Sequence, residues 1–445
     1  MIDEAQLREF YENLSDRPLE VDDPLYVPIH TGPSSGDADP IQRIARAMTW
    51  NPLESAQLLS GFRGTGKSTE LLRLRRLLNE QGFKVVLCDM RRYLNLSTKI
   101  DVSDFLICAA GAVSDSLRED PELLGTDLLR RGYWERAKDF LTRTEVKVDA
   151  LSLSGDGSAI KLGLREDPSF RETVQEQLKG HLGALADDVR AFIADCVKAL
   201  RDRHGGETKI AILFDSIEQI RGGSTDADGV FKSVEILFAG HPDKLRFEGV
   251  HVVYTVPPWL KIRAPGVTKL YDGSYTLPCV KIQTREGEPF EPGLEALREI
   301  VQKRGKHWRQ VLGSQDELDH ILRETGGYLR DLFRVLQATL MRAADDLEHT
   351  PLDRRAIDFE LAQLRNDYLP IATQDAQWLA KVARSHAAEL PEHDKIPDLS
   401  RYFDSHLLLC YRNGDEWYDI HPLIRDEVER QSSRAATEAD EAAGT

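Results

Sequence analysis

The spacing of hydrophobic positions along the chain changes repeatedly between two and about 3.6 residues, and each change marks a new element. Between residues 56 and 282, short apolar runs typical of buried strands alternate with helical stretches. This alternation predicts an α/β fold, with a parallel sheet between helices in three layers. The expected strands are Gln57–Ser60, Lys84–Cys88, Lys209–Phe214, Val250–Thr255 and Leu277–Ile282.

One insertion interrupts this alternation. Residues 144–153 and 159–164 alternate apolar and polar positions around Gly155-Asp156-Gly157-Ser158, which is typical of a β-hairpin with a turn at its tip. Long insertions either have a function or have none. Two interpretations of this hairpin are therefore open: it contacts a partner, or it is a solvent-exposed segment without a special role.

Outside the α/β domain, which we place at residues 51–288, the pattern is mostly helical. Residues 1–50 form a lead-in that we expect to pack on the next domain. Helical spacing predicts a helical lid over residues 289–350, with helices near Leu294–Arg304, Gln315–Glu324 and Tyr328–Asp346. Residues 351–431 combine helices with two strands around Asn413-Gly414, the strongest short-range signal for a hairpin. We expect a C-terminal winged helix there, and a disordered tail over residues 432–445, which are rich in Ala, Glu and Ser.

Length and composition limit the class of protein. The 445 residues are too many for one ordinary core and suggest about two to four domains. No apolar run approaches the ~20 residues needed to cross a bilayer, and the opening Met-Ile-Asp-Glu-Ala lacks the pattern of a signal peptide. We therefore expect a cytoplasmic protein without membrane contact. The five cysteines lie far apart, with no histidine at zinc-ligand spacing, and we expect them in the core.

One segment carries a complete motif for nucleotide binding. Residues Gly61-Phe62-Arg63-Gly64-Thr65-Gly66-Lys67-Ser68 fit the P-loop pattern G-x-x-x-x-G-K-[ST], between an expected strand and an expected helix. The backbone N–H groups and the helix N-terminus surround the phosphates, Lys67 neutralises the β- and γ-phosphates, and the Ser68 hydroxyl binds Mg²⁺. The residues expected to bind ATP are Gly61, Arg63, Gly64, Thr65, Gly66, Lys67, Ser68 and Thr69.

Four further residues are catalytic candidates beside Lys67. Asp215 ends an expected strand and would hold Mg²⁺, and Glu218 would polarise the attacking water, unless it is a surface acid. Thr255 lies at the carboxyl end of a strand, where ligands of α/β sheets bind. It would sense the γ-phosphate, or else is present for its β-propensity. Arg330, in the first turn of an expected helix, would reach over the nucleotide or pair with a neighbouring acid.

Together these features resemble the AAA+ superfamily over residues 50–430, and within it the branch of archaeal origin-recognition initiators and STAND signalling ATPases. The resemblance implies an ATPase with Gly61–Ser68 as Walker A motif, Asp215 as Walker B aspartate, Thr255 as sensor 1 and Arg330 as sensor 2. It also implies a role in prokaryotic signalling or antiviral defence, and a nucleotide-dependent homo-oligomer.

The sequence departs from the AAA+ pattern at two places. Ser216 follows Asp215, where most members have an adjacent Glu, and the acid comes at Glu218. This spacing is more similar to STAND proteins, in which hydrolysis is often slow and acts as a timer. The sequence also assigns no arginine finger: Lys261 and Arg263 are candidates, but their spacing selects neither.

Two functions from different classes are open. The first is a nucleotide-dependent switch for a protein partner or effector subunit. The net charge of −17 favours it, because an acidic chain repels a polyanion. Residues 351–430 carry ten Lys and Arg against sixteen Asp and Glu, an unfavourable balance for DNA binding.

The second function is a DNA-binding ATPase similar to an initiator or loader. The expected winged helix and two basic runs, Arg73–Arg76 and Lys303–Arg309, support it, and Trp308 in the second run could stack on a base. A basic run on a helix is more often a solvated face. A kinase with the same P-loop would leave the C-terminal modules unexplained.

Overall fold

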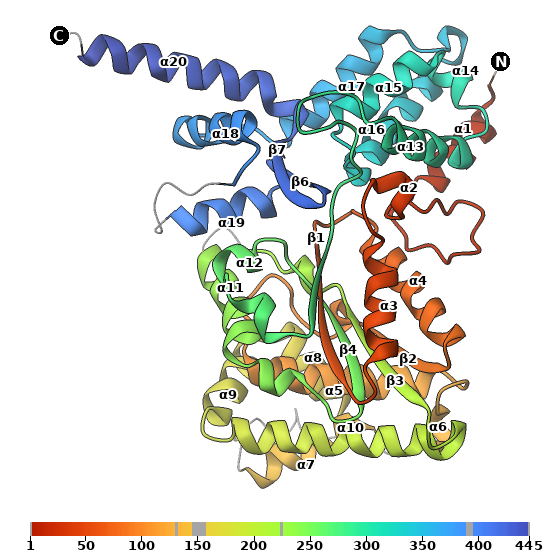
Figure 1. Cartoon of the computed structure of the whole chain (residues 1–445), viewed down its shortest axis with the longest axis vertical. Helices are drawn as coiled ribbons and strands as arrows, with labels where there is room; N and C mark the ends of the chain where they lie inside the picture. Colours follow the sequence, from red (N-terminus) through yellow and green to blue (C-terminus); the bar gives the residue numbers. More distant parts are fainter. Residues whose placement is uncertain (1, 130–131, 145–156, 223–225, 389–394, 444–445) are drawn as a thin grey trace. The chain divides into compact units, whose positions relative to one another are not determined.

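The computed structural model describes residues 2–129, 132–144, 157–222, 226–388 and 395–443 (Figure 1). The chain divides into two compact units. Unit 1 comprises Met1–Pro40, Phe62–Thr69 and Leu277–Thr445, and unit 2 comprises Ile41–Gly61 and Glu70–Thr276. The expected P-loop thus belongs to unit 1, although the strand before it belongs to unit 2.

Unit 2 is built around a five-stranded sheet with the order β2-β3-β4-β1-β5. Three strand pairs are parallel: β2 with β3, β3 with β4, and β4 with β1. The sheet confirms the α/β fold class and four expected strands, whose apolar runs are largely buried. Their bounds are Ser55–Gly61 (β1), Phe83–Asp89 (β2), Lys209–Asp215 (β3) and Val250–Val256 (β4).

The fifth strand differs from the prediction. Strand β5 spans Gly273–Leu277 and ends where we expected a strand to begin. Pro278 follows it directly, and a proline has no N–H to give to a strand ladder. The apolar run up to Ile282 is buried without being a strand.

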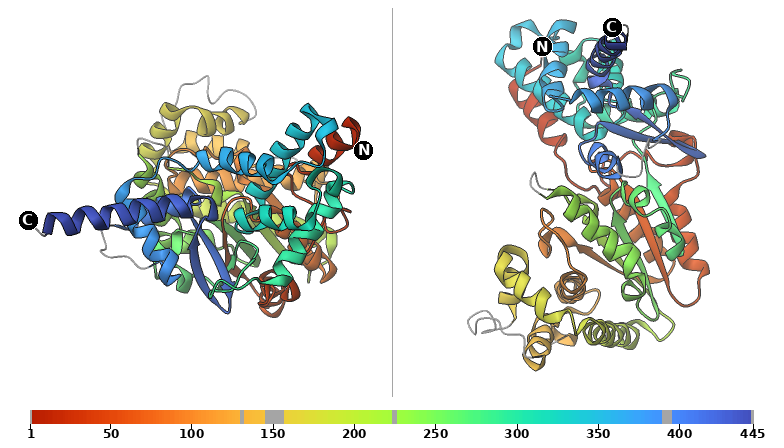
Figure 2. Two further views of the ribbon diagram at one scale, coloured as in Figure 1. Left: turned by 90° about the horizontal axis from the view of Figure 1, so that it is seen from above. Right: turned by 90° about the vertical axis from the view of Figure 1, so that its left-hand side faces the viewer.

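Helices cover both faces of the sheet (Figure 2). Helix α4 (Lys67–Glu80) follows β1, α5 (Val102–Glu119) follows β2, and α10 (Leu182–His204) precedes β3. Phe105 of α5 packs on Phe214 of β3 and Tyr254 of β4, with ring centroids 6.4 and 6.1 Å apart. This aromatic cluster fills the space between α5 and the middle of the sheet, and leucines of α4 are buried as well.

The insertion is helical where it is described. Residues 145–156, which hold nearly all of the first strand of the expected hairpin and half of its turn, lie outside the described residues. The expected second strand, 159–164, is wrong: it lies in α8 (Ser158–Glu166), between α7 (Tyr133–Arg143) and α9 (Pro168–Leu178). Ile160 and Leu164 are buried while Leu162 is exposed. A spacing of four residues puts the buried pair on one helix face, which fits the sequence as well as strand alternation does.

Unit 1 gathers the N-terminal helix and the expected lid around one core. Helices α1 (Glu4–Asn13), α13 (Glu291–Arg304), α15 (Gln315–Glu324), α16 (Leu329–Asp345) and α17 (Arg354–Asn366) contribute to it. The three helices expected in the lid are confirmed as elements. A fourth, α14 (Trp308–Leu312), was not expected, and its Trp308 is part of this core.

The C-terminal segment of unit 1 consists of helices and a hairpin. It contains α18 (Thr373–Ser385), α19 (Ile396–Asp404), β6 (Leu408–Asn413), β7 (Asp415–Ile420) and α20 (Arg425–Ala443). Strands β6 and β7 are antiparallel around Gly414, whose φ is 89°, so the predicted hairpin is confirmed. The tail expected to be disordered is instead helical as far as Ala443, because its Ala, Glu and Arg residues favour a helix.

Two expectations from composition concern the whole chain. All five cysteines are buried and free, as expected. In the described part of the chain, no helix combines the length and the apolar character that crossing a membrane requires.

Candidate functional site

Four strand ends meet at one edge of the unit 2 sheet, because their strands are parallel. Strand β1 ends at Gly61, β2 at Asp89, β3 at Asp215 and β4 at Val256, with Asp89 and Asp215 opposite each other in register. Ligands of open α/β sheets bind beyond the carboxyl ends of the strands. The P-loop follows Gly61 directly in the chain, so it starts from the edge that carries Asp215.

Residues 215–218 form a tight turn that carries two predicted acids. Ser216 has a φ of 71°, and its N–H donates to Asp215 Oδ1 at 2.7 Å. The turn leads into the short helix η2 (Ile217–Gln219), which carries Glu218. Asp215 and Glu218 are each only 5% exposed. A left-handed non-glycine residue costs about 1 to 3 kcal/mol, so its surroundings have to hold this turn in place.

Thr255 holds the turn from the neighbouring strand. Its Oγ1 accepts a hydrogen bond from the Ile217 N–H at 3.0 Å and donates to the Phe214 carbonyl at 3.3 Å. A hydroxyl has a single proton to donate, and here it goes to the backbone of β3. The geometry therefore favours a positioning role for Thr255 over the predicted contact with a γ-phosphate.

Asp89 and Arg91 also belong to this edge, and sequence reasoning missed them. Arg91 donates to both carboxylate oxygens of Asp89, from Nε at 2.9 Å and from Nη2 at 2.7 Å. Burial alone would raise the pKa of Asp89, but the hydrogen bonds from Arg91 outweigh it and hold the pKa below its usual value. The pKa of Arg91 is raised, first by its hydrogen bond to Asp89 and further by the charges of Asp89, Asp215 and Glu218. The available signal was a polar pair directly after an expected parallel strand.

The P-loop, in unit 1, has the backbone that its motif predicts. Gly64 and Gly66 have φ values of 73° and 87°, which favour glycine. The Lys67 ammonium is buried and donates to the Phe62 carbonyl at the start of the same loop. The Thr65 hydroxyl donates to the same carbonyl at 2.9 Å. The lysine thus folds back along the loop, from which it can reach a phosphate held by the loop amides.

Other parts of unit 1 support the P-loop. A Cβ atom on Gly64 would lie 2.7 Å from Arg330 Cβ, so Arg330 packs directly against the loop. The Arg330 guanidinium also donates to Asp16 Oδ2, at 2.8 Å from Nη2. The predicted pairing with an acid is therefore observed, and contact with a nucleotide stays a prediction. His30 Nε2 lies 2.9 Å from the Thr65 carbonyl, a contact that the sequence did not reveal.

The P-loop also contacts the C-terminal segment within unit 1. Phe62 stacks on Phe403 of α19, with ring centroids 5.6 Å apart and an interplanar angle of 9°. Arg63 pairs with Asp404, from Nη2 to Oδ1 at 2.8 Å. His406 packs against the Phe62 ring, and burial lowers the pKa of His406 to about 3, so this ring is neutral. The side chain of Arg63, expected at the nucleotide, is thus bound to α19.

The residues expected to hold Mg²⁺ suit that ion only together with phosphates. Among the described residues, no group of three or more His, Cys, Asp or Glu could hold a metal ion. Magnesium is usually held by one or two protein oxygens, waters and the phosphates of a substrate. Ser68 and Asp215 offer a hydroxyl and a carboxylate of this kind. They lie in unit 1 and unit 2 respectively.

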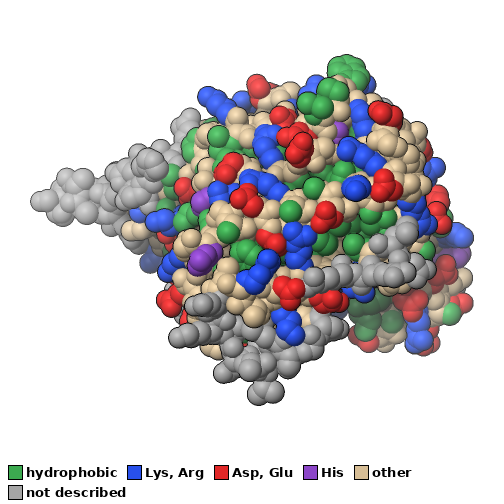
Figure 3. Space-filling view, turned by 90° about the horizontal axis from the view of Figure 1, so that it is seen from below, with side chains coloured by type: hydrophobic (Ala, Val, Ile, Leu, Met, Phe, Trp, Pro, Cys, Tyr) green, Lys and Arg blue, Asp and Glu red, His purple; other side chains and the backbone are tan. Residues whose placement is uncertain are grey.

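The two basic runs are partly buried. Arg73 is buried, and its Nε donates to Oε2 of Glu70, one turn earlier in α4, at 2.7 Å. Trp308 is 4% exposed and packs in the unit 1 core, so the expectation that it stacks on a base is wrong. Arg304 is buried and donates to a backbone carbonyl of residue 25 at 3.0 Å. On the face shown in Figure 3, basic and acidic side chains of the described residues are interspersed.

Comparisons with known proteins give similarity to solved structures alone. No family model matches this sequence, and no curated protein is significantly similar to it. Cdc6p from Pyrobaculum aerophilum is 14% identical, with 96% of this chain and 98% of that chain covered, at a TM-score of 0.39. The ORC2 protein from Aeropyrum pernix, in its ADPNP-ADP complexes, is 9% identical, with 98% of both chains covered and a TM-score of 0.42. For the ADP form of the same protein, 95% of this chain and 98% of that chain are covered, and the identity of 9% and the TM-score of 0.42 are the same. Similarity at this level assigns neither a family nor a function.

Proposed function

We propose that this chain binds ATP with Mg²⁺ at residues 61–69 and hydrolyses it slowly, as a P-loop ATPase of the AAA+ type. The observation that carries the proposal is the P-loop itself: a complete motif, with left-handed Gly64 and Gly66, between β1 and α4. The sheet edge from which the loop starts also carries the acids of the 215–218 turn. A phosphate-binding loop and an acidic strand end are the two parts that such an ATPase needs.

Each residue has a distinct proposed role. Lys67 would neutralise the β- and γ-phosphates. Ser68 and Asp215 are the residues that would hold Mg²⁺, and the ion would supply positive charge against the negative charge of the phosphates. Glu218 accepts the proton of the attacking water. Arg330, which packs against Gly64, neutralises charge on the phosphates from the helical lid.

Steady-state ATP turnover tests the proposed hydrolysis. The Glu218→Gln variant should keep ATP binding and lose about 10²-fold or more of its turnover, the usual contribution of a general base. The matched control is Glu207→Gln, an exposed acid before the opposite end of β3. Normal turnover by Glu218→Gln would make Glu218 a structural acid and remove it from the mechanism.

We further propose that the bound nucleotide acts as a switch for a protein partner, through the C-terminal segment as a winged helix. The supporting observation is that two side chains of the P-loop contact α19. Phe62 stacks on Phe403, and Arg63 forms an ion pair with Asp404. A phosphate group at the loop competes with Asp404 for Arg63, since both are anions that an arginine binds well. Nucleotide state and the position of α19 are then coupled.

Removing the competing carboxylate tests this coupling. The Asp404→Asn variant should bind ATP more tightly by about 5-fold or more, the low end of typical coupling. Asp398→Asn, on the same helix but paired with other residues, should leave the affinity unchanged. Equal affinities for wild type and Asp404→Asn would show that the ion pair does not couple the loop to α19.

DNA binding is the second candidate function. It is supported by three exposed basic residues in the two basic runs, Arg76, Lys306 and Arg309. ATP turnover with and without duplex DNA at low salt separates the two. Stimulation by DNA, lost at higher salt, would establish a DNA-dependent ATPase. Turnover indifferent to DNA leaves the switch for a protein partner.

A further inference from the structure

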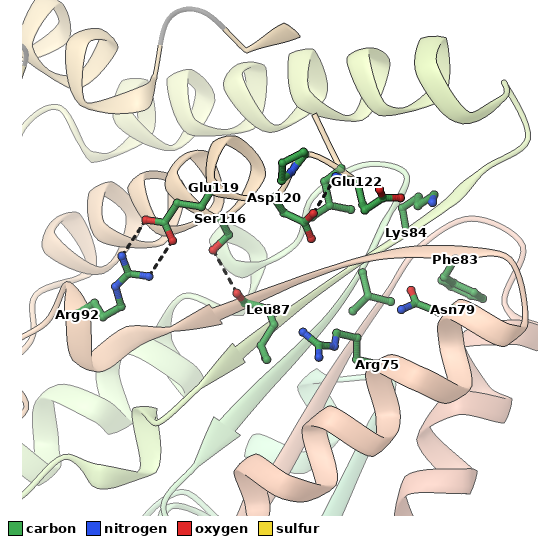
Figure 4. A pocket seen from close by; sticks show the side chains of 13 residues that line it. Arg75, Asn79, Phe83, Lys84, Leu87, Arg92, Ser116, Glu119, Asp120 and Glu122 are labelled. Atoms are coloured by element: carbon green, nitrogen blue, oxygen red, sulfur yellow. Dashed lines mark hydrogen bonds and ion pairs between the residues drawn. The ribbon is translucent and has the colours of Figure 1, made fainter. Parts of the chain in front are cut away.

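A cavity of about 730 Å³ lies along the outer side of strand β2, in unit 2 (Figure 4). Strand β2 is the last strand on its side of the sheet, so its outer edge has no neighbouring strand among the described residues. Figure 4 shows α4 and α5 on opposite sides of this edge, with β2 between them. The cavity is thus a groove whose floor is a strand edge and whose two walls are helices.

The backbone of β2 presents hydrogen-bonding groups to this groove. The Ser116 hydroxyl donates to the Leu87 carbonyl at 3.1 Å, so the polar groups of Leu87 point away from β3 and toward α5. Successive residues of a strand point their N–H and C=O groups to opposite sides. Val85 and Phe83 therefore also face the outer edge, and both line the groove. Such an edge is a template for another strand.

The two walls of the groove differ in charge. The α4 wall carries Arg75 and the amide of Asn79. On the α5 wall, Glu119 is already held by two hydrogen bonds from Arg92. Beyond Glu119, the exposed carboxylates of Asp120 and Glu122 follow.

Lys84 also lines the groove and lies beside Glu122 in Figure 4. Small-molecule pockets are lined mainly by apolar side chains with a few polar groups. This groove has an unusually charged lining and a backbone edge, which match the main chain and the charged side chains of a peptide.

We infer that the outer edge of β2 binds an extended segment of a protein partner as an added strand. Side chains of such a strand point alternately toward α4 and toward α5. Acidic side chains of the segment face Arg75, and the basic side chains between them face Asp120 and Glu122. Its charged residues therefore alternate in sign along the sequence. Main-chain hydrogen bonds supply affinity and the alternating side chains supply specificity.

The first test uses two labelled peptides of about eight residues, long enough to span a typical strand. One alternates Glu and Lys; the other repeats Glu-Glu-Lys-Lys, with the same composition but mixed charges on each face. In fluorescence anisotropy at low salt, the alternating peptide should bind at least about tenfold more tightly. Equal affinities, or no saturation by the alternating peptide at about 1 mM, would overturn the inference.

The second test removes one donor from the strand edge. Val85→Pro loses the outward N–H, and proline is tolerated on edge strands. Val85→Ala also removes the valine side chain beyond Cβ but keeps the N–H, so it serves as the control. The alternating peptide should bind Val85→Pro about tenfold more weakly than Val85→Ala, the value of about one hydrogen bond. Equal binding by the two variants, each checked for an intact thermal transition, would contradict strand addition.

Hydrogen exchange on the wild-type protein provides a readout that needs no variant. The alternating peptide should slow the exchange of the outward amides of Val85 and Leu87 and leave Val86, which faces β3, unchanged. Protection confined to other segments would overturn the inference. Dimerisation of the chain that protects the same outward amides and excludes the peptide would assign the groove to a second copy instead.

This surface would serve the partner of the proposed switch, so the inference extends that function. Its tests contain no nucleotide, however. A failure of peptide binding would leave ATP hydrolysis untouched, and a failure of hydrolysis would leave the groove untouched.

Discussion

The Thr255 hydroxyl offers a direct test of how the acidic turn is held. Thr255 is fully buried, and its Oγ1 joins β4 to the turn through the Ile217 N–H at 3.0 Å and the Phe214 carbonyl at 3.3 Å. Thr255→Val keeps the shape of the side chain and replaces the hydroxyl with a methyl group. The N–H of Ile217, itself fully buried, then has lost its partner.

The magnitude follows from the desolvation of that group. A buried donor that loses its partner costs about 1 to 3 kcal/mol. For a domain of about 150 to 250 residues, each kcal/mol lowers Tm by about 2 to 4 °C. Thr255→Ser keeps the hydroxyl and loses one methyl group, at about 1 kcal/mol. If the turn relaxes in Thr255→Val, Glu218 moves with it, and a displacement of about 1 Å costs up to about 10²-fold in rate.

Thermal melts and ATP turnover of the two variants together decide between roles. A positioning role predicts that Thr255→Val loses both stability and turnover, while Thr255→Ser retains turnover. A direct contact with the γ-phosphate predicts lost turnover with unchanged Tm in Thr255→Val. That second pattern, or normal behaviour of Thr255→Val in both assays, would refute the reasoning from the hydrogen bonds.

Two further predictions concern the P-loop and a buried acid. Lys67→Ala should weaken ATP binding by about 10- to 100-fold, the value of a charged hydrogen bond. The control Lys269→Ala, at an exposed position, should leave ATP binding unchanged. Calorimetry with ATP measures both affinities, and equal values would contradict the P-loop assignment. Burial raises the pKa of Asp104 to about 7, although a hydrogen bond from Gln175 opposes this. The folded state therefore holds a proton that the unfolded state releases near pH 4, and this carboxyl destabilises the fold as pH rises from about 4 through 7. Melts at pH 5 and pH 8 should show a smaller loss of Tm for Asp104→Asn than for wild type, and parallel losses would contradict the shift.

The sequence predicted the elements whose patterns admit a single reading. The strands β1 to β4 are short apolar runs bounded by polar residues, and the helices α13, α15 and α16 have long apolar faces, so period and length agree. The β6–β7 hairpin was predictable because Asn413-Gly414 suits its turn. The P-loop was predictable because its motif sets the backbone locally.

Patterns with two readings gave the errors. Ile160, Leu162 and Leu164 alternate like a strand, but a helix that buries the first and third and exposes the second satisfies the same letters. The apolar run after Leu277 contains Pro278, which ends β5 and leaves the rest buried in irregular backbone. In both places the outcome depends on packing against other segments, which a local pattern does not contain.

Contacts across the fold could not be found along the chain. Asp89 reaches the site because the register of two strands far apart in the sequence sets it opposite Asp215. Arg91 follows only as the partner of Asp89. Thr255 was found by its position on a strand, but its hydrogen bonds to Ile217 and Phe214 change what it is expected to do.

Burial decides how the basic runs bear on function. A sequence shows that Lys303–Arg309 is positively charged, but Arg304 and Trp308 are buried in the structure, and Arg304 is bound to a backbone carbonyl. Charge that is buried inside the fold attracts no phosphate, since binding to DNA requires exposed cations that displace counterions. With a net charge of −17 on the whole chain, the remaining exposed basic residues have to overcome a repulsive background. A protein partner that brings charges of both signs meets no such barrier, which is why the mixed-charge groove along β2 is the surface to test first.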